Sequence, residues 1–220
     1  MKSLKSKKKT RIAASYDENS LLTRMLKTLL AIVCSTAALT SALAKDPPLS
    51  LHPDNPHYFL WRGQPTVLIT SAEHYGAVIN LDFDYAVYLR ELEKRKLNNT
   101  RLFSGAYVEP IGAFKIARNT LAPLPERFIA PWARSDQPGY ANGGNKFDLT
   151  RWDENYFQRL RDFVEQAGRR GVVVEMNLFC PFYAESQWEL SPQNARNNIN
   201  DIGNIEREMV YTLDQNGGLL

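Results

Sequence analysis

The run Val172–Phe179, "VVVEMNLF", decides the fold class, because this β-branched, apolar segment directly follows an amphipathic helix. The helix is predicted from apolar residues at helical spacing, namely Phe157, Leu160, Val164 and Ala167. Thr150 and Asp153 resemble a capping box at its start. A helix that leads into a buried strand is the repeating unit of parallel β/α folds. This part of the sequence therefore indicates a parallel sheet.

The same alternation occurs earlier in the chain. Two apolar runs around Arg62-Gly63 predict a short hairpin, and the segment Thr66–Thr70 predicts a strand buried on both faces. A helix with Asp82 as its N-cap follows, and then a strand at Thr100–Gly105. The apolar face of this helix consists of Tyr85, Tyr88, Leu89 and Leu92. The order of elements indicates parallel units with right-handed crossovers, in either an open doubly wound sheet or a barrel.

The segment 106–147 has no clear periodicity and is rich in Gly, Pro and aromatic residues. Loops longer than roughly 15 residues are uncommon in compact domains and are usually functional when they are ordered. We therefore expect this segment to cover a site. Its aromatic residues, and those that follow, either stack on sugar rings or anchor the loop by burial, and we expect half of them only to anchor: Tyr107, Phe114, Trp132, Tyr140, Tyr183 and Trp188.

The N-terminus predicts an export signal. Six Lys and Arg residues occur between residues 2 and 11, and an apolar stretch after Met25 ends in Ala42-Leu43-Ala44, with small residues where a signal peptidase cleaves. We predict a signal peptide over 1–44 with cleavage after Ala44, a linker at 45–56, and a secreted or periplasmic product. Two alternatives remain open, a true start at Met25 and a signal retained as a membrane anchor.

Composition and charge argue against an intrinsically disordered chain and against a nucleic-acid-binding protein. Hydrophobic residues make up 44% of the 220 residues, which is ordinary for a folded protein. Residues 1–44 hold eight Lys/Arg and two Asp/Glu, so the remainder has 19 basic and 22 acidic residues and a net charge of −3. The basicity belongs to the leader, and we expect no nucleic-acid partner. With Cys34 in the leader, Cys180 has no partner for an intrachain disulfide.

No cofactor and no metal are predicted. No strand is followed by a G-x-G-x-x-G motif, and the P-loop, H-E-x-x-H and G-x-S-x-G motifs are absent. The histidines after the leader, His52, His57 and His74, show no spacing typical of metal ligands.

Candidate site residues follow from the strand ends, where ligands collect in parallel β/α folds. His74 and Tyr75 come after the first predicted strand; His74 is either a hydrogen-bonded loop histidine or a group that binds a sugar hydroxyl. Strand alternation places Arg101 on one face of the second strand, and Glu175 and Asn177 on one face of the third. We expect Arg101 and Glu175 to meet inside the sheet or barrel, as a structural ion pair or as an Arg that orients a catalytic carboxylate.

Three segments together resemble the N-terminal part of cellulase-like (β/α)8 glycoside hydrolases, related to family 5 of clan A: "FLWRGQPTVLITSAEHYGAV" (59–78), "YLRELEKRKLNNTRLFSG" (88–105) and the stretch from "NTLAPLPERF" to "NLFCPFY" (119–183). The resemblance implies a partial TIM barrel over 57–220 with about the first three β/α units. It implies that Arg101 sits beneath the nucleophile. It also places Glu175 at the end of the third strand, with Asn177 where the family has a sugar-contacting His.

The resemblance assigns both catalytic Glu residues of the family to later strands, which this sequence lacks. We therefore assign no catalytic residue and expect the 220 residues to be inactive alone. The predicted substrate-binding residues are His74, Tyr75, Arg101, Tyr107, Glu175 and Asn177. The leading hypothesis is an exported glycoside hydrolase with a carbohydrate substrate. The alternatives are a non-catalytic carbohydrate-binding protein and a half-barrel completed by a second chain.

Overall fold

The computed structural model describes residues 47–70 and 74–205. The chain divides into two compact units, an N-terminal unit that ends at Thr66 and a main unit that begins at Val67. The predicted signal peptide over 1–44 lies outside the described residues. Among the residues that are described, no helix combines the length and apolar character that crossing a membrane requires.

The N-terminal unit is a small antiparallel sheet. Its strands are β1 (Ser50–Leu51), β2 (Phe59–Trp61) and β3 (Gln64–Thr66), paired in the order β1-β2-β3. Arg62 and Gly63 connect β2 to β3, and both have a positive φ, as the commonest two-residue hairpin turn requires. The predicted hairpin is therefore confirmed. The predicted linker at 45–56 contains the short strand β1.

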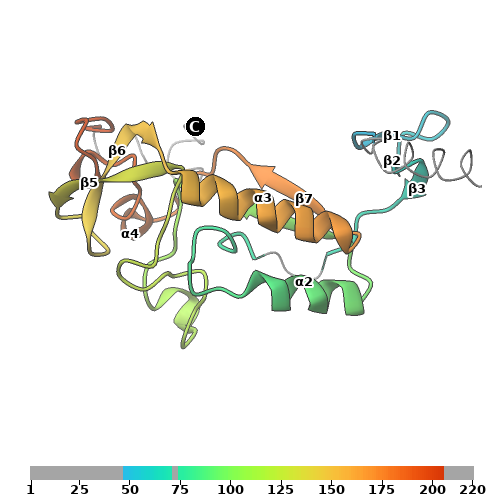
Figure 1. Cartoon of the computed structure of the whole chain (residues 1–220), viewed down its shortest axis with the longest axis horizontal. Coiled ribbons are helices and arrows are strands. Elements are labelled where there is room, and N and C mark those ends of the chain that lie inside the picture. Colours follow the sequence, from blue (N-terminus) through green and yellow to red (C-terminus); the bar gives the residue numbers. More distant parts are fainter. Residues whose placement is uncertain (1–46, 71–73, 206–220) are drawn as a thin grey trace, which may run out of the picture. The chain divides into compact units, whose positions relative to one another are not determined.

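The main unit contains a parallel pair of strands with two long helices, and Figure 1 shows α3 alongside β7, with α2 next to it. The elements are α2 (Tyr85–Lys94), β4 (Asn99–Phe103), α3 (Glu154–Arg169) and β7 (Val173–Asn177). β4 and β7 pair in parallel with Arg101 directly opposite Glu175. The predicted parallel β/α arrangement is confirmed for these two strands.

The predicted strand at Thr66–Thr70 is wrong. Beyond Thr66, the last residue of β3, the segment lies outside any strand, and Val67 and Ile69 are exposed rather than buried on both faces. It is tied to the start of β4 through Asn98, whose main-chain N–H donates to the carbonyl of Ile69 (3.0 Å) and whose side chain donates to that of Val67 (2.8 Å). An apolar run forms a buried strand only where neighbouring elements cover it, and the described residues leave this one open.

The described part of the chain is a mixed α/β structure with small sheets and no closed barrel. Its sheets are the three-stranded sheet of the N-terminal unit, the pair β4-β7, and a second pair, β5-β6. The expected partial TIM barrel is not confirmed, because the parallel strands of the described residues are the single pair β4 and β7.

β5 and the first residues of β6 lie within the segment 106–147, expected to be a long loop, and β6 continues beyond it. β5 (Trp132–Pro138) and β6 (Asn145–Trp152) are antiparallel and shift register twice. The guanidinium of Arg134 lies over the rings of Tyr140 and Phe147, at 4.4 and 3.8 Å from their centroids, and donates to the carbonyl of Asn145 at 2.7 Å. The expectation of an aperiodic loop is therefore wrong for this part of the segment.

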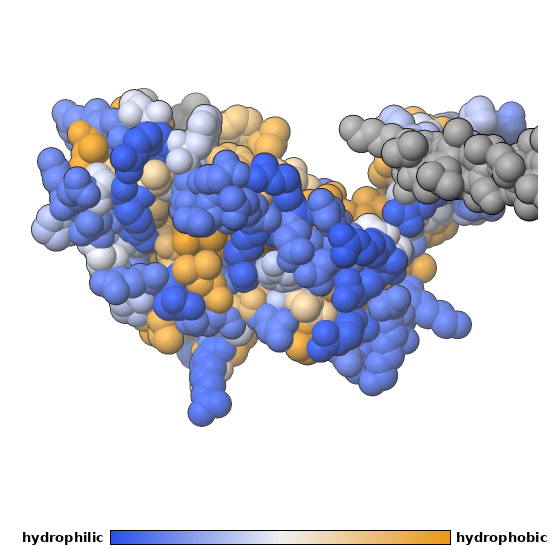
Figure 2. All heavy atoms as spheres, viewed as in Figure 1, coloured by the Kyte–Doolittle hydropathy of each residue, from blue (hydrophilic) through white to orange (hydrophobic). Residues whose placement is uncertain are grey.

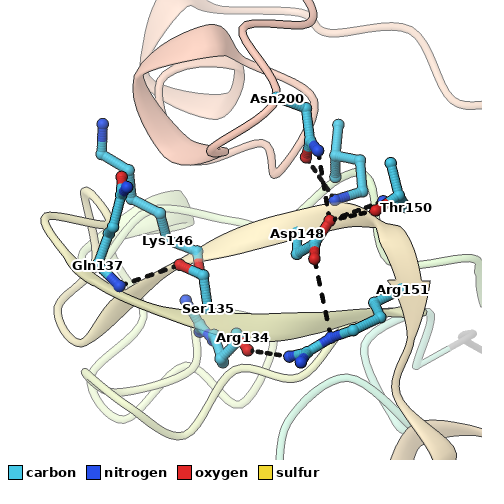
Figure 3. A network of polar contacts seen from close by, with 9 residues as sticks. Arg134, Ser135, Gln137, Lys146, Asp148, Thr150, Arg151 and Asn200 are labelled. Atoms are coloured by element: carbon cyan, nitrogen blue, oxygen red, sulfur yellow. Dashed lines mark hydrogen bonds and ion pairs between the residues drawn. The ribbon is translucent and has the colours of Figure 1, made fainter.

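A polar network anchors the C-terminal part of the described chain to β6, as Figure 3 shows. Asn200 accepts a hydrogen bond from the main chain of Leu149 (2.7 Å) and donates to the carboxylate of Asp148 (3.3 Å). Asp148 also accepts from the hydroxyl and the main-chain N–H of Thr150. The short helices α4 (Glu185–Trp188), η1 (Ala113–Lys115) and η2 (Ala195–Asn197) complete the main unit.

The hydrophobic core lies between the two long helices and β4, where Leu89, Leu102 and Phe163 are fully buried. The predicted helix starts need correction. Asp84, rather than Asp82, caps α2 by accepting from Val87 (3.0 Å), and Asp153 caps α3 without a contribution from Thr150. The predicted stripe of α3 is also shifted, because Tyr156, Phe163 and Ala167 are buried while Val164 is exposed. Figure 2 shows the hydrophilic outer surface over both helices.

Candidate functional site

A cleft opens beyond the carboxyl ends of β4 and β7, with a volume of about 520 Å³. We name it the strand-end cleft. Its walls come from the residues after β4, the residues after β7, the β5-β6 pair, α4, and the segment that follows. The lining residues are Ser104, Ala106, Pro131, Trp132, Leu149, Trp152, Leu178, Phe179, Cys180, Phe182, Trp188, Gln193, Ile202, Gly203 and Ile205. Among these described lining residues none carries a formal charge.

Three tryptophans reach the strand-end cleft from three different elements. Trp132 opens β5, Trp152 closes β6 directly opposite it, and Trp188 ends α4. Trp152 is 68% exposed and Phe179 is 84% exposed. Large aromatic faces that remain exposed around one cleft are typical of binding sites, and they match ligands with a flat apolar face.

A buried carboxylate lies behind the wall of the cleft. Glu109 is only 3% exposed, and its Oε1 accepts hydrogen bonds from the phenols of Tyr75 (2.7 Å) and Tyr107 (2.8 Å). Its Oε2 accepts from the side-chain amide of Gln187 (3.2 Å). A buried carboxylate is stable only when donors satisfy its oxygens. The three hydrogen bonds therefore stabilise Glu109 in the interior and fix the positions of Tyr75, Tyr107 and Gln187.

The Glu109 cluster sets the position of the cleft wall. The side-chain oxygen of Gln187 accepts from the main-chain N–H groups of Tyr183 (2.8 Å) and Ala184 (2.9 Å). The segment that leads into α4 is therefore linked through Gln187 to Glu109. This segment supplies Cys180, Phe182 and Trp188 to the lining of the cleft.

The groups around Glu109 are proton donors that stay neutral near pH 7. Burial, followed by the hydrogen bond to Glu109, raises the pKa of Tyr75 and of Tyr107 far above the usual value for a phenol. Burial, with the nearby Glu109 charge, raises the pKa of the Cys180 thiol to about 11. Cys180 is therefore a neutral thiol and a poor nucleophile at neutral pH.

The predicted contact between Arg101 and Glu175 is confirmed, with 3.0 Å between Nε and Oε1. The pair is partly exposed to solvent, at 37% and 49% of the two side chains, rather than enclosed. Asn177 lies two residues further along β7, opposite Phe103, and its main-chain carbonyl accepts from Ser104 (3.2 Å). The predicted residues Arg101, Glu175 and Asn177 therefore lie along the paired strands, before the residues that line the cleft.

His74 lies apart from the strand-end cleft. Its ring stacks on Phe83 with 3.6 Å between centroids, and its Nε2 pairs with the hydroxyl of Thr120 at 2.7 Å. Burial lowers the pKa of His74 to about 4, so the imidazole is neutral at pH 7. Its Nδ1 is buried without a hydrogen-bond partner among the described residues.

The structure thus brings together two pairs of the predicted substrate-binding residues, Tyr75 with Tyr107 on Glu109, and Arg101 with Glu175. Sequence reasoning missed Glu109 and Gln187 as a bonded pair, because 78 residues separate them. It also missed Trp152, although the alternation of Phe147 and Leu149 with polar residues signals a strand that ends there. Of the loop aromatics, Tyr107 and Tyr140 are buried and anchor the fold, whereas Phe114 and Tyr183 are exposed.

Within residues 47–70 and 74–205, no three His, Cys, Asp or Glu side chains gather closely enough to bind a metal ion.

Comparisons with known proteins give one distant likeness. No protein-family model matches the sequence, and no curated protein matches it. A solved structure described as a "putative glycoside hydrolase" from Bacteroides vulgatus ATCC 8482 matches with 15% sequence identity and a TM-score of 0.46. The match covers 65% of this chain and 26% of that one, so this chain spans about a quarter of that protein. The functional assignment rests on the site itself.

Proposed function

We propose that this chain is the sugar-binding part of an exported glycoside hydrolase of the cellulase-like type, and that carbohydrate binds in the strand-end cleft. The observation that carries the proposal is the convergence of Trp132, Trp152 and Trp188 beyond the carboxyl ends of a parallel strand pair. Ligands bind at this end of parallel sheets, and aromatic faces match the C–H face of a sugar ring. The sequence resemblance to cellulase-like enzymes supports the same class.

In this proposal Trp152 is the main stacking surface, because its ring is largely exposed and belongs to a paired strand. Trp132, directly opposite on β5, extends the same wall. Gln193 is the polar side chain of the lining with no hydrogen bond from its amide to another described residue, and it is available to a sugar hydroxyl.

Sugar binding is tested by calorimetric titration of the purified chain with a panel of neutral oligosaccharides, including β-glucans, xylans and mannans. We expect saturable binding of at least one sugar and an affinity about tenfold lower in Trp152→Ala, since one aromatic contact contributes roughly 0.5–1.5 kcal/mol beyond its buried area. The control is Trp61→Ala in the N-terminal unit, which should leave the affinity unchanged. Equal affinities of Trp152→Ala and the original chain would contradict the proposal.

Hydrolysis requires two carboxyl groups about 5 to 5.5 Å apart for a retaining mechanism, one of them protonated. Glu109 is occupied by three donors and Glu175 by Arg101. We therefore give both a structural role and assign no catalytic residue within the described part of the chain. Release of reducing sugar by the full-length gene product tests the enzymatic half of the proposal.

The same observation favours a second candidate, a carbohydrate-binding protein without catalysis. If the full-length product binds oligosaccharides in the strand-end cleft but releases no reducing sugar from any substrate in the panel, this second function replaces the first.

Export through the predicted signal is part of the proposal. N-terminal sequencing of the exported product should then begin at Lys45.

A further inference from the structure

A second cavity, of about 590 Å³, lies between the segment before α2 and the loop that contains η1. We name it the loop pocket. It is lined by Asn80, Asp82, Ile111, Gly112, Ile116, Arg118, Asn119, Thr120, Ala122 and Leu124. None of these residues lines the strand-end cleft, so the loop pocket is a separate site.

One wall of the loop pocket is apolar. Ile111, Ile116 and Leu124 are each more than half exposed, although all three belong to an ordered loop. Single exposed aliphatic side chains are normal, but three around one cavity form a contiguous apolar surface. This surface is suited to bind the aliphatic or aromatic part of a small molecule.

The polar frame of the loop pocket is preformed. The side chain of Asn80 donates to the carbonyl of Thr120 (2.8 Å), and the side chain of Asn119 accepts from the main chain of Leu121 (3.0 Å). Thr120 is bonded through its hydroxyl to His74, and Asp82 through its carboxylate to Arg127 at 2.7 Å. These groups are already paired, so they hold the shape of the pocket.

Arg118 differs from the rest of the lining. It is exposed and has no ion pair or hydrogen bond to another described residue. Its φ of 55° is in the left-handed region, as are those of Phe114 and Lys115 in the same loop. Non-glycine residues in this region cost free energy, and they occur more often at ligand-binding sites than elsewhere.

We propose that the loop pocket binds a small amphipathic monocarboxylate, with its apolar body against Ile111, Ile116 and Leu124 and its carboxylate on Arg118. A guanidinium pairs with a carboxylate through two parallel hydrogen bonds. Arg118 is the one cationic side chain among the described lining residues, so a single negative charge matches the pocket better than a dianion such as a phosphate monoester. This site is independent of the proposed sugar site.

The test is a ¹H–¹⁵N NMR titration of the purified chain with hexanoate, with the neutral hexanamide, and with the dianion hexyl phosphate. We expect saturable shifts at Asn119 and Thr120 with hexanoate, and an affinity about tenfold lower for hexanamide, as expected for the loss of one charge-assisted pair. Arg118→Gln should lower the hexanoate affinity to that of hexanamide. Arg161→Gln, on the exposed face of α3, is the matched control and should change nothing.

Arg118→Gly removes the same cation while relieving the left-handed strain, so it should stay folded and lose hexanoate affinity to the same extent. Leu124→Ser should weaken hexanoate and hexanamide alike. The proposal is overturned if hexanoate and hexanamide bind equally, if hexyl phosphate binds more tightly than hexanoate, if neither Arg118 variant changes the affinity, or if no shift saturates by about 20 mM ligand.

Discussion

The phenol of Tyr75 donates a 2.7 Å hydrogen bond to Glu109, which lies 34 residues further along the chain. Tyr107 and Gln187 donate to the same carboxylate, so Glu109 links three segments whose aromatic rings also pack against one another, as the ring of Tyr107 does on Phe182. The position of the cleft wall therefore depends on the Glu109 carboxylate and its three donors, and replacing Glu109 tests this dependence directly.

Replacing Glu109 by alanine should lower the free energy of unfolding by about 3 kcal/mol or more, because three buried or partly buried donors lose their acceptor. Glu109→Gln should cost less, since one oxygen remains to accept from the phenols. Urea unfolding followed by tryptophan fluorescence measures both. Glu165→Gln on the exposed face of α3 is the control. A cost for Glu109→Ala no larger than that of the control would show that the cluster is not a structural anchor.

The buried His74 should make stability fall in mild acid. Its folded-state pKa of about 4 lies below the unfolded value of 6.5, so the unfolded state binds the extra proton between these values. The contribution of neutral His74 is complete above pH 6.5 and declines as the pH falls toward 4. We expect a loss of about 2 kcal/mol between pH 7 and pH 5 from this group.

His74→Phe keeps an aromatic ring against Phe83 and removes the titrating group. Urea unfolding at pH 7 and pH 5 should therefore show a smaller difference in the variant than in the original chain. An unchanged difference would mean that His74 does not carry the pH dependence.

The ion pair between Arg101 and Glu175 should contribute little to stability. Because both side chains are partly exposed, at 37% and 49%, a double-mutant cycle with alanine should give a coupling energy of about 0.2–1 kcal/mol. The pair of Arg169 and Glu165 on α3, also separated by 3.0 Å, is the matched comparison. A coupling above about 2 kcal/mol would indicate an enclosed pair, as expected from the strand alternation.

Gly105, directly after β4, should not tolerate a side chain. Its φ is 109°, and a Cβ atom at this position would lie 2.8 Å from the ring of Pro131. We expect Gly105→Ala to cost about 2–3 kcal/mol. Gly171→Ala separates the two causes, because its φ of 74° is strained for alanine but no atom lies within 4 Å, and it should cost about 1 kcal/mol. Thermal unfolding of both variants measures the two losses of stability. Equal losses for Gly105→Ala and Gly171→Ala would rule out the steric clash with Pro131.

The parallel pair and its two helices could be predicted from sequence because their signals are local. Leu89 and Leu92 repeat at helical spacing on α2, and alternation along β4 and β7 places Arg101 and Glu175 on the same face. The segment Thr66–Thr70 shows where this reasoning fails. Whether an apolar run is buried depends on the elements that pack against it, and the sequence of the run itself does not specify them.

The candidate site was less accessible to prediction. Tyr75 was identified from its place after a predicted strand and Tyr107 as an aromatic residue of the long loop. Their shared acceptor Glu109 and its partner Gln187 depend on contacts between distant segments. The β5-β6 pair was missed because two register shifts and Pro138 weaken its alternation. The turn residues of "YANGG" (140–144) were the signal that marked it.

The pairing of β4 with β7 also has a consequence for folding during synthesis of the chain. Arg101 and Glu175 are 74 residues apart, with the whole β5-β6 pair and α3 between them. Contacts between strands so far apart in the sequence form slowly, and the backbone groups along the edge of β4 remain unpaired until β7 joins it. On the ribosome, β4 therefore emerges long before β7 exists, and the nascent chain must keep this apolar edge from aggregating until the second strand has been made.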